Sequence, residues 1–150
     1  MRDLKAHIEQ CVGKPIASKL DAEMSEIELL LTPKHMGRGM NIAYQRYMAE
    51  FYFDRFPFKK YDPAVLFANV AAWLMDNDDE REQQLGELKD PDIEVIIEDE
   101  NSAEVLIQVR FEEPIKVVED SEGPIYWMGK QWRIEEYEIW VAERLDVVIR

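Results

Sequence analysis

The chain has 150 residues, 47% of them hydrophobic and 33% charged, which is the composition of a globular protein with one core and excludes a disordered chain. The net charge is −14, so repulsion opposes binding to a phosphate backbone. The start of the sequence lacks the pattern of a signal peptide, and no stretch reaches the roughly 18 apolar residues that span a membrane. Together with the single cysteine, Cys11, these features predict a cytoplasmic protein.

The charge is uneven along the chain. Residues 1–75 carry 10 Lys and Arg against 9 Asp and Glu, a net charge of +1. Residues 76–150 carry 8 against 23, a net charge of −15. An acidic surface of this kind either keeps the protein soluble or meets a basic partner.

The first third of the chain predicts two short helices and two strands. Asp3 is a candidate cap for a helix over residues 3–12, Pro15 can open a second short turn, and residues 26–32 read as a strand. A loop over 33–40 follows, and its Lys34, His35 and Arg38 are candidate contacts for an acidic neighbour.

An aromatic strand is expected over residues 41–53, with Tyr47, Ala49, Phe51 and Phe53 on one face. Asp62 and Pro63 then open a helix that runs to about Met75. This helix is apolar almost all round, so it must be covered on most of its circumference. The cover is either the N-terminal helix of the same chain or a neighbouring copy, for which Phe67 and Trp73 are the candidate contacts.

The second half predicts further strands. Residues 93–98 and 103–111 are expected to form a hairpin, and a tight hairpin is expected around Met128, Gly129 and Lys130. The predicted fold is therefore α+β, a mainly antiparallel sheet with two or three helices packed on one face. We expect one domain over 1–150, with residues 120–150 as a C-terminal extension or arm.

A search for catalytic or ligand-binding motifs yields little. The acidic run at 76–82 lacks the glycine that a calcium loop needs at its sixth position, and the glycines at 37 and 39 are too few for a phosphate loop. Cys11 falls on an apolar helix face, which favours a small buried side chain over a nucleophile. The aromatic group comprises Tyr126, Trp127, Trp132, Tyr137 and Trp140. Stacking on bases or sugars is one use for it, but core packing or a subunit interface is favoured. We expect no enzyme activity, cofactor or metal.

Several local phrases resemble the tail completion protein R (GpR) family of contractile-tailed temperate bacteriophages. They are "IASKL" at 16–20, "YQRYMAEFYFDRF" at 44–56, "AAWLMDND" at 71–78, and the paired strands after residue 91. The resemblance covers residues 15–120 and implies a fold similar to tail terminators, which form a ring on the tail tube.

The resemblance implies a structural role in a phage or prophage: completing the tail by capping its tube so that the head can join. Partners would be the tail tube and head–tail connector proteins, with further copies of the chain in a ring, hexameric if it follows the tube. The implied location is the host cytoplasm during assembly and then the virion tail. Direct nucleic-acid and membrane partners are not expected. The alternative is an acidic module that mimics DNA and occupies a basic groove on a partner, and a small-molecule enzyme ranks third.

Overall fold

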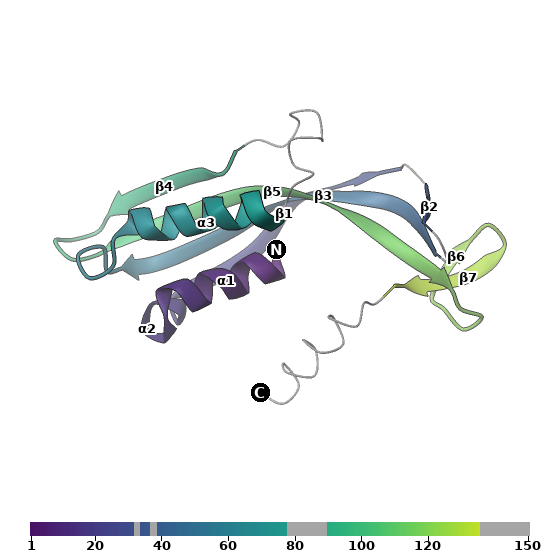
Figure 1. Ribbon diagram of the computed structural model, residues 1–150, viewed down its shortest axis with the longest axis horizontal. Helices are drawn as coiled ribbons and strands as arrows, with labels where there is room; N and C mark the ends of the chain where they lie inside the picture. Colours follow the sequence, from purple (N-terminus) through teal and green to yellow (C-terminus); the bar gives the residue numbers. More distant parts are fainter. Residues whose placement is uncertain (32–33, 37–38, 78–89, 136–150) are drawn as a thin grey trace. The chain divides into compact units, whose positions relative to one another are not determined.

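The computed structural model describes residues 1–31, 34–36, 39–77 and 90–135, and Figure 1 shows its helices and strands. In chain order they are α1 (Arg2–Val12), α2 (Lys14–Ala17), β1 (Leu20–Leu30), β2 (Lys34–Met36), β3 (Gly39–Phe56), α3 (Pro63–Asn77), β4 (Asp92–Ile97), β5 (Ala103–Glu119), β6 (Ile125–Trp127) and β7 (Lys130–Ile134). The predicted α+β class with a mainly antiparallel sheet is confirmed. Within the described ranges, every helix is too short or too polar to cross a bilayer.

Two long strands dominate the sheet. Its strand order is β1-β3-β5-β7-β6, and β2 and β4 pair with β3 and β5 respectively. β3 has 18 residues and β5 has 17, whereas strands in globular proteins usually have about five or six. The chain forms two compact units, and each long strand contributes to both. Unit 1 comprises residues 1–28 and 46–112, and unit 2 comprises 29–45 and 113–150.

The core of unit 1 lies between one face of the sheet and the helices. Alternate residues of β3 and β5 point to this face and are buried, as the period of a strand requires. They are Tyr47, Ala49, Phe51 and Phe53 from β3, with Val105, Ile107, Val109 and Phe111 from β5. Leu4 and Ile8 of α1 and Leu66 and Val70 of α3 pack into the same cluster. The predicted apolar face of β3 and the placement of helices on one face are both confirmed.

The other face of β3 and β5 carries a polar network. Ser25 Oγ donates to Glu50 Oε1 over 2.7 Å, and Gln108 Nε2 donates to Glu50 Oε2 over 3.2 Å. Arg46 pairs with Glu112 at 3.2 Å. Glu50 and Glu112 thus have partners within unit 1. Burial of the opposite face alone accounts for the alternation of apolar and polar residues along both strands.

Unit 2 has a smaller core of Met40, Val117 and Trp132. β6 and β7 form the expected hairpin, and its two central residues, Met128 and Gly129, have φ of 53° and 72°. Positive φ at both positions is the signature of a two-residue turn that follows the twist of its strands. This hairpin lies within the predicted extension at 120–150, while Tyr137, Trp140 and all of 136–150 lie outside the described residues.

The structure corrects four local predictions. Asp3 does not cap α1: Met1 is the N-cap, and Asp3 lies in the first turn. The segment 33–40 is not a plain loop, since β2 pairs with the start of β3. β1 begins at Leu20 and β5 continues to Glu119, both well beyond the predicted bounds. Pairing with a long neighbour overrides the local breaker signals, including Pro114 within β5.

Gly123 provides a test of packing in unit 2. A Cβ at this position would collide with the carbonyl group of Trp132, so Gly123→Ala should destabilise the protein by about 3 kcal/mol. Gly129 is the control, because an added Cβ meets open space there and only the positive φ is penalised, by about 1 kcal/mol. Urea unfolding followed by tryptophan fluorescence measures both. Equal losses for the two variants would contradict the described packing.

Candidate functional site

The helix α3 has one buried side and one open side. Asp62 Oδ1 accepts the N–H of Ala64 over 2.9 Å and so caps the first turn, as predicted. Leu66, Val70 and Leu74 form the buried stripe. Opposite this stripe lie six exposed apolar residues, Ala64, Val65, Ala68, Ala71, Ala72 and Met75, and the last turn adds the exposed Asp76. The described part of the chain therefore covers only half of this apolar helix.

Phe67 and Trp73 lie at the borders of the buried stripe. Both are half-buried and pack against the core of unit 1. The Trp73 ring meets that of Phe111 edge-on, with centroids 6.5 Å apart. Packing within the chain thus explains why both are aromatic, and their role as subunit contacts stays a prediction.

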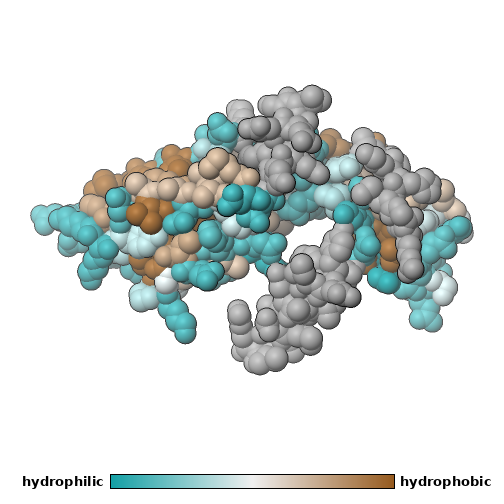
Figure 2. All heavy atoms as spheres, in the orientation of Figure 1, coloured by the Kyte–Doolittle hydropathy of each residue, from teal (hydrophilic) through white to brown (hydrophobic). Residues whose placement is uncertain are grey.

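The strand β4 extends the exposed apolar area. All six of its residues are exposed, including Ile93, Val95 and Ile97, which are 42%, 43% and 64% exposed. Their partners in the register are Ile107, Val105 and Ala103, so they face the helix-covered side of the sheet. We call these three residues and the six exposed apolar residues of α3 the apolar surface. Figure 2 shows brown and tan side chains gathered over α3 and β4.

Of the predicted basic loop residues, Lys34 and His35 belong to unit 2, whereas Phe67 and Trp73 belong to unit 1. Lys34 and His35 lie in β2, paired with Asn41 and Met40 respectively. Arg38 lies outside the described residues.

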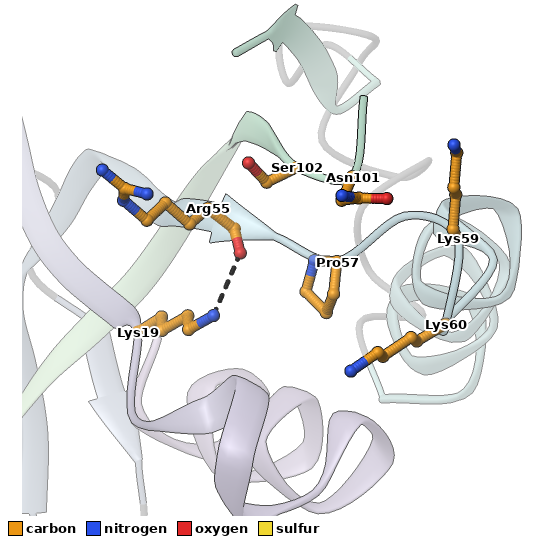
Figure 3. Close-up of a pocket in the computed structure, with 7 residues that line it drawn as sticks. All are labelled: Lys19, Arg55, Pro57, Lys59, Lys60, Asn101 and Ser102. Carbon is orange, nitrogen blue, oxygen red and sulfur yellow. Dashed lines mark hydrogen bonds between the residues drawn. The ribbon is translucent and has the colours of Figure 1, made fainter. Parts of the chain in front are cut away.

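Sequence reasoning missed a second feature, a basic hollow of about 430 Å³ in unit 1 (Figure 3). It is lined by Lys19, Arg55, Pro57, Lys59, Lys60, Asn101 and Ser102. These residues come from the turn before β1, the end of β3, the connection to α3 and the β4–β5 turn. Only the adjacent pair of lysines at 59 and 60 signals the cluster in the sequence.

Hydrogen bonds that involve backbone groups hold the walls of the basic hollow in place. Lys19 Nζ donates to the carbonyl of Arg55 over 3.2 Å, and the N–H groups of Lys60 and Tyr61 both donate to the carbonyl of Pro57. Arg55 has a φ of 52°, in the left-handed region that non-glycine residues rarely adopt. Its N–H donates to Glu98 Oε1 over 3.0 Å.

The β4–β5 turn beside the basic hollow is built around Asp99. Asp99 Oδ1 accepts the N–H groups of Asn101 and Ser102, over 2.7 and 2.8 Å. The N–H of Asn101, then Ser102 and the charge of Arg55 lower the pKa of this carboxyl, because all of them favour the ionised form.

Two groups with metal-binding or nucleophilic atoms provide no site. The carboxylates of Asp54, Glu98 and Glu104 approach within 4.8 Å, but exposed acidic groups often lie together, and Glu98 already accepts the N–H of Arg55. Burial raises the pKa of the Cys11 thiol, which lowers the thiolate fraction and makes it a poor nucleophile.

Comparison with protein families decides what kind of chain carries these surfaces. Residues 1–136 match the family P2 phage tail completion protein R (GpR). The chain belongs to the GpR family. The resemblance seen in the local phrases is confirmed and extends well beyond residues 15–120. Family membership supports a structural role in a phage tail.

A curated relative also comes from a phage. The chain is 34% identical over 113 residues to an uncharacterized 19.2 kDa protein in the rep-hol intergenic region of Haemophilus phage HP1 (strain HP1c1). The match covers 75% of this GpR-family chain and 66% of the relative, just under two thirds of its length. No solved structure matches the chain.

The Asp99 turn predicts a pH dependence of stability. Because the folded state lowers the pKa of this carboxyl, its stabilising contribution is present at neutral pH and is lost as the pH falls through that pKa. Asp99→Asn keeps the oxygen that accepts the N–H groups but does not titrate. Its free energy of unfolding should fall less than that of the wild type between neutral pH and about pH 3. Parallel curves for the two proteins would contradict the role of Asp99.

Proposed function

We propose that this GpR-family chain completes the tail by capping the tail tube, and that the capped tube then accepts the head. Copies of the chain would dock into a ring on the end of the tube through the apolar surface of α3 and β4. Membership of the tail completion family supports the role, and the half-covered helix α3 is the observation that supports docking as its mechanism.

The energetics of the apolar surface favour an occupant. Fully burying one large aliphatic side chain stabilises a protein by about 1.5–3 kcal/mol, and Val65, Met75 and the three β4 residues are between 42% and 74% exposed. Monomers rarely leave several such side chains together in water. The four alanines on α3 also let a second element approach the helix closely, because interaxial distances depend on the side chains at the contact.

A second copy is the occupant that a ring requires. In a ring, one patch of a subunit contacts a different patch of the next subunit. The apolar surface, which lies on one side of unit 1, would be one of these two patches. A ring that follows the tube would be hexameric, as the family resemblance implies. Lys34, His35 and Arg38 are the proposed contacts to an acidic neighbour, and the acidic second half would present charge to the tube or connector.

Tails made without the chain test the role itself. Electron microscopy should show tubes with open or irregular ends and few joined heads. Adding the purified protein back should restore head joining. Closed tubes of normal length that accept heads in its absence would contradict a capping role.

Charged substitutions in the apolar surface test the mechanism. Ala68→Glu and Ala72→Glu each place a carboxylate on the exposed face of α3, where a docked copy would bury it at a cost of several kcal/mol. We expect at least a tenfold loss of head-joined tails. Unfolding stability should change by only about 0.5 kcal/mol, because both sites are exposed.

The matched control is Ala6→Glu, the same change at an exposed helical position of α1 that lies outside the apolar surface. It should leave the yield of head-joined tails unchanged. If the α3 variants assemble as well as this control, docking through α3 is wrong.

A further inference from the structure

The basic hollow is unexpected in so acidic a chain. Four cations line it, Lys19, Arg55, Lys59 and Lys60, and no carboxylate does. The chain as a whole has 32 Asp and Glu against 18 Lys and Arg. Figure 3 shows the four side chains at the rim of the space between the end of β3, the connection to α3 and the β4–β5 turn, with the ends of Arg55 and Lys59 pointing away to opposite sides.

Three carboxylates near the basic hollow accept backbone N–H groups, and the charge of Arg55 also acts on one of them, Asp99. Glu98 accepts the N–H of Arg55, Asp99 accepts two N–H groups of its own turn, and Asp62 caps α3. In the part of the chain that the structure describes, none of the four cations forms an ion pair with a carboxylate. Four like charges around one hollow repel each other, and an anion between them would relieve that repulsion.

An adjoining hollow of about 410 Å³ shares Lys19, Pro57 and Lys60 with the basic hollow. Its other lining residues are mainly apolar: Val12, Pro15, Ile16 and Tyr61. Tyr61 is fixed by the bond from its hydroxyl to the carbonyl of Cys11, over 3.3 Å, and by edge-on contact with Phe56. The two hollows therefore form one groove, with a cationic half and an apolar half.

We propose that this groove binds a short segment of another tail protein in which acidic residues stand next to apolar ones. The carboxylates would lie among Lys19, Arg55, Lys59 and Lys60, and the apolar side chain against Ile16 and Tyr61. Charge-assisted bonds to a desolvated carboxylate are stronger than neutral ones, and the apolar half adds burial.

A protein segment fits the groove better than nucleic acid does. A duplex covers more surface than the groove offers, and the remaining surface of a chain with net charge −14 would repel it. The apolar half of the groove offers a phosphate no charge to pair with. A segment of a few residues, by contrast, reaches the cations without bringing a long run of negative charge to the acidic surface.

The proposal rests on the proposed function only in expecting the partner among tail proteins. The groove residues are not part of the apolar surface of α3 and β4, so the two can fail separately. If the groove binds no partner, a variant of the groove will bind to tails as well as the wild type does. If docking through α3 is wrong, the Ala68 and Ala72 variants will show it.

Binding of the labelled full chain to purified tails that lack it measures the contribution of the groove. The double variant Lys59→Glu/Lys60→Glu should bind at least tenfold more weakly than wild type in about 50 mM salt, and the difference should shrink as salt increases. Lys59→Arg/Lys60→Arg keeps the charge and should retain most of the binding. The control Lys5→Glu/Lys130→Glu makes the same charge change at exposed cations outside the groove, and its lost surface pairs contribute little.

Photocrosslinking identifies the occupant. A photoreactive amino acid in place of the exposed Asn101, which lines the basic hollow, is introduced into the full chain in cells that produce tails. The expected product joins this position to a segment of another tail protein that contains both acidic and apolar residues. Crosslinks only to nucleic acid, crosslinks only to a second copy, the absence of any crosslink, or a double variant that binds as well as its control would each overturn the proposal.

Discussion

One-sided burial of β3 and β5 is the constraint on which unit 1 depends. Phe51 and Phe53 alternate with Glu50 and Tyr52, so one face of the sheet must be covered and the other can meet water. A single layer of helices provides that cover. Such a layer has its own outer side, and on α3 that side is apolar. The part of the fold that the structure describes has only two layers, so nothing in it covers the outer side of α3, and the apolar residues on that side are therefore exposed.

The polar face of the sheet shows how an acidic chain tolerates its charge. Glu50 accepts bonds from Ser25 and Gln108, and Glu112 and Glu26 pair with Arg46 and Arg110. Because these carboxylates are paired with donors and cations, the net charge overstates how much of the surface repels anions. The four cations of the basic hollow differ, because none of them pairs with these carboxylates. A strongly negative protein can in this way keep a local site for anions.

Features set by local chemistry could be predicted from the sequence. The alternation of apolar and polar residues in β3 predicted its buried face, and Asp62 and Pro63 predicted the start of α3. Met128 and Gly129 predicted the tight hairpin. Features set by distant pairing could not. β2 exists because Lys34 and His35 meet the start of β3, and β5 passes Pro114 because its neighbours continue. The basic hollow was invisible for the same reason, since Lys19 and Arg55 are brought to Lys59 only by the fold.

The two long strands also limit how this protein can be divided. Unit 1 is made from residues 1–28 and 46–112, and unit 2 from residues 29–45 and 113–150. Each unit consists of two separate segments of the chain. The boundary between the two units cuts through both β3 and β5. No single truncation can therefore excise one unit intact, and a fragment library would recover neither as an independent module. Recombination that exchanges parts between related genes would have to transfer both segments of a unit together.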